Sequence, residues 1–392
     1  MRRHLFELPE GVIYLDGNSL GPLPKVVPGR VEAMLRDQWG AQLIGGWNHA
    51  GWMAQPTALG DRVGALIGAK PGSLVLGDTL SIKVYQALAA ALALQPDRRV
   101  VLSDTGNFPT DLYMADGLLR TIDKGHRLKL VEPQAIAEAL DETVAVLLLT
   151  HVDYRTGRMH DMAALTEKAH AHGIPVIWDL AHSAGAVPVD FAASGAEFAI
   201  GCTYKYLNAG PGAPAFIAVR PDIADTIEPA LAGWLGHAAP FAFDRDYRPG
   251  PGIERLRVGT PPVIQMAALD AAMDVWDGVA MEDIRARSLA LSELFIVEVE
   301  RRCPDVRLVS PRDPDHRGSQ VSFAFEQGYA VIQALIARGV IGDFRAPNIM
   351  RFGFTPLYLE QSDVFAAAEH LETVMAQRLW DDVRFKTRAA VT

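Results

Sequence analysis

Short apolar segments alternate with helical segments through the middle of this chain. Between residues 56 and 262, strand-length runs rich in Val, Ile and Leu are followed by apolar positions at helical spacing. The expected strands lie at 73–76, 99–103, 144–150, 175–179, 198–202 and 215–219. Strands that alternate with helices are typical of an α/β fold with a doubly wound, mostly parallel sheet.

The pattern changes after residue 262, where a long helical region at 263–302 is loosened near Gly278. Beyond it, short strands alternate with helices, which predicts a small α+β domain. These strands are expected at 306–309, 320–325 and 349–354, and the helices at 330–338 and 362–379.

The chain is therefore expected to have three parts. Residues 1–55 are rich in loops, with one helical pattern at 26–39, and should pack with the small domain. Residues 56–262 form the large domain, and residues 263–392 form a linker helix and the small C-terminal domain.

Composition and charge narrow the class of protein. The 392 residues are 49% hydrophobic and 21% charged, which is ordinary for a soluble protein with a substantial core. A net charge of −10 argues against nucleic acid or an anionic membrane as a partner. The N-terminus, MRRHLFELPEG, has no apolar signal-peptide core, and Cys202 and Cys303 suit a reducing compartment. We therefore expect a cytoplasmic protein.

Two side chains of complementary chemistry follow expected strands. Asp179 ends the apolar run at 175–179, and Lys205 follows the run at 198–202, on a turn formed by Asn-Ala-Gly-Pro-Gly. The carboxyl ends of parallel strands meet at one sheet edge, where open α/β folds bind ligands. Alone, the acid would be read as a helix cap and the lysine as a solvated charge. Together with Tyr204 they predict a pyridoxal phosphate site, because the lysine forms a Schiff base with the aldehyde and the acid keeps the ring nitrogen protonated.

The two segments DLAHSAG and CTYKYLNAGPG, which carry this acid and this lysine, resemble the kynureninase family. These enzymes belong to the class V aminotransferase group and have fold type I, with a large, mostly parallel sheet domain and a small α+β domain. The resemblance, which extends from Asp16 to about Tyr358, implies hydrolysis of L-kynurenine to anthranilate and L-alanine in tryptophan catabolism. The spacing of 26 residues from Asp179 to Lys205 suits the wider class V group equally well.

The resemblance also implies a set of cofactor contacts. Ser81 opens a helical pattern and would hold the phosphate with Tyr204, although it could equally be an ordinary helix cap. Phe108 would stack on the ring, unless it is a core residue beside a turn, and His182 would lie beside the acid. The full expected set is Leu80, Ser81, Phe108, Asp111, Thr150, Asp179, His182, Tyr204, Lys205, Trp234 and Thr260.

Substrate contacts and assembly follow from the same resemblance. Arg351 matches the arginine that grips the α-carboxylate of an amino-acid substrate with two parallel hydrogen bonds. The segments around Ser19, Trp47 and Asn48 resemble the pocket rim, where a structural role is as good an interpretation. Trp234 and Thr260 match residues that reach the cofactor of the partner subunit, which implies a homodimer with shared active sites; many family members have Asn in place of Thr260.

The expected catalytic residues are Lys205, Tyr204 and Asp179. The substrate amine would displace the lysine, which then moves the Cα proton while the acid stabilises the pyridinium charge. Tyr204 and the phosphate would relay protons, and water would add to the γ-carbonyl before the Cβ–Cγ bond breaks.

Two alternatives stay open. One is another class V reaction, such as a β-lyase, a cysteine desulfurase or an aminotransferase, and neither Cys202 nor Cys303 has the position of a desulfurase nucleophile. The other is a non-catalytic cofactor-binding regulator, which would not need Arg351. No metal site is expected, since His170 and His172 lack the i,i+4 spacing of a helical zinc pair. The sequence does not rank kynurenine against 3-hydroxykynurenine.

Overall fold

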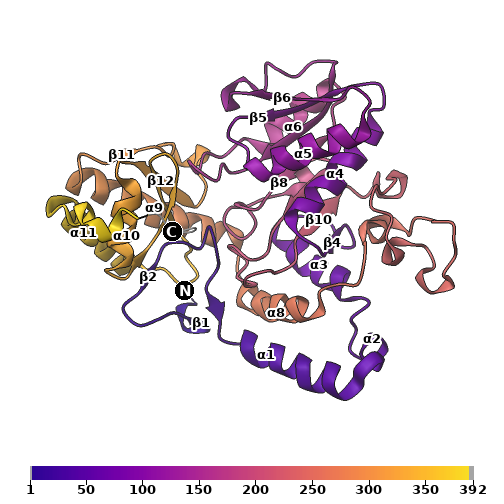
Figure 1. The fold of residues 1–392 in the computed structure, drawn as a ribbon, viewed down its shortest axis with the longest axis horizontal. Helices are drawn as coiled ribbons and strands as arrows, with labels where there is room; N and C mark the ends of the chain where they lie inside the picture. The colour runs from indigo at the N-terminus through magenta and orange to yellow at the C-terminus, as the bar shows by residue number, and fades with distance from the viewer. Residues whose placement is uncertain (1, 388–392) are drawn as a thin grey trace.

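A seven-stranded sheet forms the larger of two lobes in the computed structural model, which describes residues 2–387 (Figure 1). Its strands are β4 (Leu74–Leu76), β5 (Val100–Asp104), β6 (Arg127–Val131), β7 (Val144–Thr150), β8 (Val176–Asp179), β9 (Phe198–Gly201) and β10 (Phe216–Val219). The order across the sheet is β4-β10-β9-β8-β7-β5-β6, with β10 antiparallel to both neighbours and the remaining pairs parallel. The predicted doubly wound, mostly parallel sheet is confirmed.

Strand β7 shows why these sequences form central strands. All of its residues are buried, and from Val146 to Leu149 successive side chains enter different halves of the core. Val146 and Leu148 join the cluster on one face, while Leu147 and Leu149 join the cluster on the other. A strand covered by helices on both faces must be apolar throughout. The helices of this lobe are α3 (Gln55–Leu66), α4 (Leu80–Leu94), α5 (Pro109–Ile122), α6 (Met162–Ala171), α7 (Phe191–Ser194) and α8 (Val263–Met273).

Strand β6 was not predicted. Its sequence, RLKLV, alternates polar and apolar residues, and the strand pairs only with β5 at the edge of the sheet among the described residues. Since an edge strand is partly solvated, it lacks the continuous apolar run of the central strands.

The smaller lobe has a four-stranded antiparallel sheet in the order β11-β12-β15-β14. N-terminal strand β2 (Ile13–Tyr14) pairs with β13 (Val340–Ile341) of this lobe, and β1 (Phe6–Glu7) pairs with β3 (Leu23–Pro24). The other elements are α9 (Met281–Arg302), β11 (Arg307–Leu308), β12 (Gln320–Ala324), α10 (Gly328–Ile336), β14 (Asp343–Arg345), β15 (Ile349–Gly353) and α11 (Gln361–Ala376).

The expected helix at 263–302 is two helices. Helix α8 ends at Met273, a 3-10 turn follows, and α9 begins at Met281. Gly278 lies in the break with φ +69°, a left-handed conformation that favours glycine. The boundaries at 55/56 and 262/263 stay predictions.

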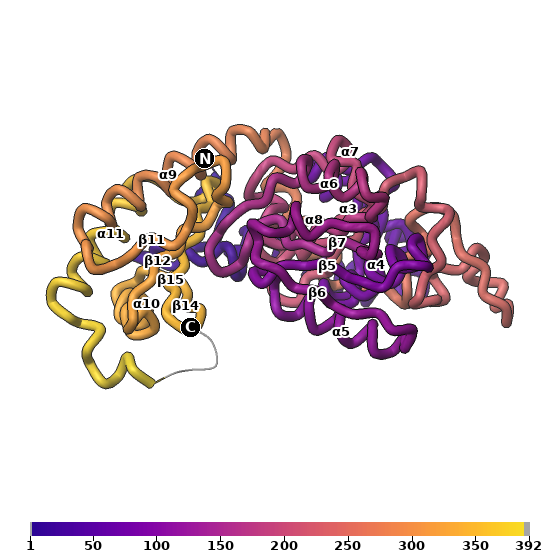
Figure 2. The backbone as a smooth tube through the Cα atoms, turned by 90° about the horizontal axis from the view of Figure 1, so that it is seen from above, coloured from indigo at the N-terminus to yellow at the C-terminus, as the bar shows by residue number. Residues whose placement is uncertain are grey.

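Two segments extend from the larger lobe. The first contains α1 (Val27–Ala33), a π-helical continuation at Met34–Gly40, and α2 (Gly46–His49), and Figure 1 shows it as an arm below the lobe. Arg30 ties this arm to Asp270 and Asp274 in and after α8. The second is the projecting segment, residues 225–250, which extends outward at the far side of the lobe in Figure 2.

Candidate active site

The carboxyl ends of neighbouring strands bring the predicted acid and lysine to one edge of the sheet. Asp179 ends β8 opposite Thr150, which ends β7, and Lys205 follows β9. Lys205 Nζ lies 2.8 Å from His182 Nε2. Burial and the charge of Lys205 lower the pKa of His182 well below its usual value, so the imidazole is neutral and accepts from the ammonium.

The loop that carries the lysine is shaped by its own sequence. Thr203 Oγ1 donates to Pro214 O at 2.7 Å, and Asn208 has φ +58°. The N-terminal segment closes over this loop, because Gly21 N donates to Tyr204 O at 2.8 Å. A Cβ on Gly21 would lie 2.3 Å from Lys205 O, so only glycine permits this approach.

Two buried carboxyl groups lie beside the lysine. Asp179 and Asp111 are each 1% exposed, and Asp179 Oδ1 accepts from Ala181 N at 2.7 Å. Burial and the adjacent Asp179 raise the pKa of Asp111 well above its usual range, and burial also raises the pKa of Asp179. Asp111 Oδ2 has no hydrogen-bond partner in the described chain. A site with two buried acids favours a cation, so the protonated ring nitrogen of pyridoxal phosphate fits it.

The start of α4 fits the phosphate. Thr79 is the N-cap of this helix but makes no side-chain cap hydrogen bond, and the first turn has no acidic residue. The first N–H groups of a helix lack partners within it and attract anions. The alternative interpretation of Ser81 as the N-cap is wrong, because Leu80 and Ser81 already lie in the first turn.

The loop before α5 presents an aromatic ring to the lysine. Lys205 Nζ lies 5.9 Å from the ring centroid of Phe108 and 5.8 Å from that of Tyr204. Asn107, which the sequence analysis missed, anchors this loop: its Oδ1 accepts from Phe108 N at 2.6 Å and from the Thr150 hydroxyl. Thr150 thereby supports the loop that carries Phe108.

Arg351 reaches the same region from the smaller lobe. The side chain is 1% exposed and donates to Asp343, to Ser19 Oγ at 3.0 Å and to Tyr154 O. Tyr154 follows β7, so this contact joins the two lobes. Asp343 was not predicted from the sequence, because the three-residue strand β14 has no recognisable apolar pattern.

Four predicted residues lie on the arm or are exposed to solvent. Trp47 and Asn48 lie on α2 at the end of the arm, away from β8 and the smaller lobe in Figure 1. The Trp47 ring packs edge-to-face on Trp52 at 5.5 Å. Trp234, in the projecting segment, and Thr260 are solvent-exposed.

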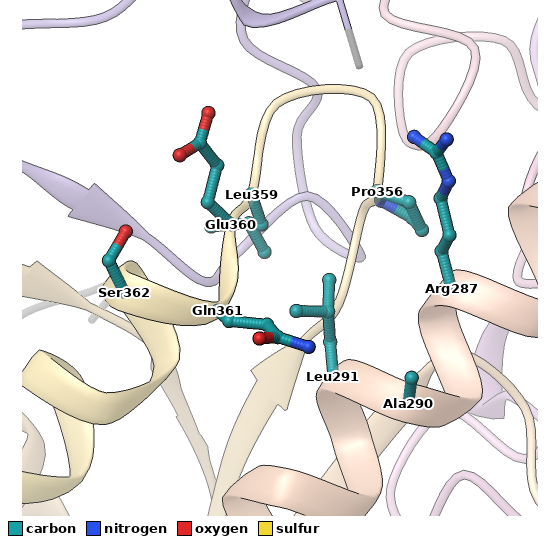
Figure 3. Close-up of a pocket in the computed structure, with 8 residues that line it drawn as sticks. All are labelled: Arg287, Ala290, Leu291, Pro356, Leu359, Glu360, Gln361 and Ser362. Carbon is teal, nitrogen blue, oxygen red and sulfur yellow. The ribbon is translucent and has the colours of Figure 1, made fainter.

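A surface pocket with a volume of about 510 Å³ lies between α9 and the start of α11 in the smaller lobe. Figure 3 shows Leu291 and Gln361 pointing toward each other across it. None of the predicted site residues lines this pocket.

Solved structures with the same fold are known. The apo structure of a cysteine desulfurase from Thermococcus onnurineus NA1 aligns with a TM-score of 0.80 and 19% identity, covering 96% of this chain and 97% of that one. A C-DES variant with glycine covalently linked to the PLP-cofactor aligns with a TM-score of 0.81 and 18% identity, covering 95% and 99%. The fold is that of the fold type I pyridoxal-phosphate enzymes, as predicted.

Sequence relatives identify the family. Kynureninases from Pseudomonas fluorescens and Burkholderia pseudomallei (strain 1106a) are each 49% identical over 397 residues, covering 100% of this chain and 95% of theirs. The model of the kynureninase C-terminal domain matches residues 284–371, and that of the DegT/DnrJ/EryC1/StrS aminotransferase family matches residues 86–196. The chain belongs to the kynureninase family, which confirms the resemblance found in its motifs.

Proposed function

We propose that this chain is a pyridoxal-phosphate-dependent hydrolase that cleaves L-kynurenine between Cβ and Cγ, giving anthranilate and L-alanine. The observation that carries the proposal is the 49% identity to kynureninases over the full length of the chain. The position of Asp179 and Lys205 at one sheet edge, with Arg351 bonded to Tyr154 O from the smaller lobe, supports it. The test is direct: purified protein loaded with cofactor should convert kynurenine to fluorescent anthranilate, and the absence of this product would contradict the proposal.

Each residue of the site has a role in this reaction. When bound, pyridoxal phosphate supplies a carbonyl for the substrate amine and a ring that withdraws electrons. Lys205 would hold the cofactor and would carry the proton at the substrate Cα. Asp179 would stabilise the protonated ring nitrogen, and the neutral His182 accepts a hydrogen bond from the lysine. Burial raises the pKa of Tyr204, so its hydroxyl stays protonated and would be a donor for the phosphate.

Arg351 is proposed to bind the substrate α-carboxylate, with Ser19 beside it. Arg351→Ala should keep the coloured cofactor but raise KM for kynurenine about a hundredfold or more, because breaking a buried charge pair typically costs roughly 3–5 kcal/mol. Asp343 would still pair with Arg345 Nη2 at 2.9 Å, so the variant should fold. Steady-state kinetics and the absorption spectrum measure the two effects, and loss of colour would reassign Arg351 to the cofactor.

Asp16 should make substrate binding depend on pH. Burial and the nearby Asp343 raise the pKa of Asp16 to about 7. Asp16 is therefore neutral below this pH and negative above it, where it repels a substrate carboxylate at Arg351. The charged and hydroxyl groups around it are Tyr14, Ser19, Tyr206, Asp343, Arg345, Arg351 and Tyr358.

We therefore expect KM for kynurenine to rise above pH 7, and Asp16→Asn to flatten this rise. A pH series of KM for both proteins provides the measurement. An equal rise in the variant would show that another group titrates.

The proposed assembly is a homodimer with shared sites. Large apolar side chains are exposed on the arm and the projecting segment, including Ile44 at 80%, Leu43 at 65%, Phe243 at 78% and Phe241 at 64%. Apolar groups gathered on a surface commonly mark interfaces. In the dimer, Trp234 and Thr260 would complete the phosphate site of the partner, and Trp47 and Asn48 would border its substrate pocket.

The desulfurase alternative is disfavoured by the thiols. Cys202 and Cys303 are both free and buried. Burial raises the pKa of Cys202, and burial raises the pKa of Cys303 to about 11, whereas a nucleophilic cysteine needs an accessible thiolate. Free thiols also agree with the proposed cytoplasmic location. Among residues 2–387, no helix has the length and apolar character needed to cross a membrane.

A further inference from the structure

Arg351 has a partner that the strand register holds directly opposite it. Asp343 on β14 faces Arg351 on β15 as a cross-strand pair, and each residue is 1% exposed. Arg351 Nε donates to Asp343 Oδ1 at 2.6 Å, and Arg351 Nη2 donates to Oδ2. Directly opposed side chains in an antiparallel pair lie close together, so the backbone itself places this carboxylate on one edge of the guanidinium.

The remaining donors of the guanidinium point away from that carboxylate. Arg351 Nη2 also donates to Ser19 Oγ at 3.0 Å, and Nη1 donates to Tyr154 O. The Nη1–Nη2 edge therefore faces a hydroxyl and a main-chain carbonyl group. Two parallel N–H groups on one edge match a carboxylate.

Asp343 is itself held from several sides. Besides Arg351, its Oδ2 accepts from Ser19 Oγ at 2.6 Å and from Arg345 Nη2 at 2.9 Å. With donors on both oxygens, the carboxylate has one orientation. Because this carboxylate is fixed, the plane of the guanidinium bonded to it is fixed too.

We propose that Asp343 is the positioning residue for substrate recognition: it fixes the Arg351 guanidinium so that the Nη1–Nη2 edge is presented to the substrate α-carboxylate. The inference rests on the proposed function, in which Arg351 binds that carboxylate. Asp343 does not touch the substrate and acts through Arg351. A guanidinium held in its binding geometry loses less conformational entropy when the substrate binds.

The direction in which KM changes when Asp343 loses its charge distinguishes a positioning role from simple charge balance. If Asp343 were only a counterion, removing its charge would leave Arg351 and Arg345 more attractive to a carboxylate, and KM would fall. If Asp343 orients Arg351, its loss lets the guanidinium turn away, and KM rises although the site has become more positive.

The test compares Asp343→Asn with wild-type enzyme. We expect KM for kynurenine to rise about tenfold or more, with kcat within about threefold and the cofactor spectrum unchanged. Inhibition by the kynurenine analogue that lacks the α-carboxylate should not change.

In an Arg351→Gln background, Asp343→Asn should have no further effect on KM, because the residue through which it acts is already lost. Arg345→Gln provides a graded comparison: Ser19 Oγ and Arg351 Nε still donate to the Asp343 carboxylate, so KM should rise less than in Asp343→Asn.

An unchanged or lower KM for Asp343→Asn, or a full additional loss in the Arg351→Gln background, would overturn the proposal. If Asp343→Asn does not fold, Asp343→Glu is the second variant, because it keeps the charge and displaces it by one methylene. A positioning role then predicts a higher KM, and charge balance predicts an unchanged KM.

If wild-type protein releases no anthranilate, the proposed function fails by itself. L-Alanine, followed by the cofactor spectrum, is then the probe: a higher Kd in Asp343→Asn supports the positioning role, and an equal Kd refutes it.

Discussion

Asp179→Ala is expected to bind pyridoxal phosphate weakly and to lose nearly all turnover. Asp179 is 1% exposed, so its charge interacts with the ring nitrogen where water screens it little. Breaking a buried charge pair by removing one partner costs roughly 3–5 kcal/mol, which corresponds to a loss of roughly a hundredfold to several thousandfold. Cofactor titration by absorbance and kcat for kynurenine measure the two effects.

Two further variants separate the charge of Asp179 from its shape. Asp179→Asn keeps the volume of the side chain and an oxygen for Ala181 N, so a loss of turnover similar to that of Asp179→Ala assigns the effect to charge. Asp111→Asn makes the same chemical change in the neighbouring acid. Burial and the adjacent Asp179 raise the pKa of Asp111 well above its usual range, so this substitution should remove less negative charge than Asp179→Asn and have a smaller effect on turnover. Near-normal turnover in Asp179→Asn would refute the charge role.

The chemistry of the cofactor site could be predicted from sequence because it is local. Asp179 ends one fully buried strand and Lys205 follows another, and a buried parallel strand is a continuous apolar run that is easy to recognise. The expected strand at 144–150 matches β7 at both ends. Turn residues after β9 then placed the lysine on its loop. Here the sequence pattern and the position of the side chain are set by the same few residues.

The surroundings of Arg351 were harder to predict for a physical reason. Strand β14 contains three residues, two of them charged, and its role depends on pairing with β15 rather than on its own pattern. The pair of Asp343 and Arg351 therefore becomes visible only from the register. Asn107 is similar, since its contact with Thr150 joins residues on different strand ends.

The fold of a single chain does not show contacts that a residue would make with a partner subunit. Trp47 lies on the arm, and Trp234 and Thr260 are exposed, although the family resemblance assigns all three to an active site. The proposed shared site would reconcile these observations, because a residue exposed in one chain can be buried in an assembly. The complementation of inactive chains tests this assignment.

A mixture of two inactive chains, Lys205→Ala and Trp234→Asp, is expected to recover activity. The first chain lacks the lysine that holds the cofactor. The second places a carboxylate where Trp234 would contact the partner's phosphate, and like charges at short range disfavour binding. In a heterodimer with reciprocal sharing, both lesions fall in one site, and the other site has Lys205 from one chain and Trp234 from its partner.

Random re-equilibration should make about half of the dimers mixed, so about a quarter of all sites would be intact. Anthranilate release per chain should therefore approach about a quarter of the wild-type value. The matched control mixes Lys205→Ala with Asp179→Ala: both lesions affect the chain's own half of the site, so every heterodimer site stays defective and no activity should return. If the first mixture also stays inactive while re-equilibrated wild-type chains recover, Trp234 acts within its own chain or only in packing, and the shared-site assembly is wrong.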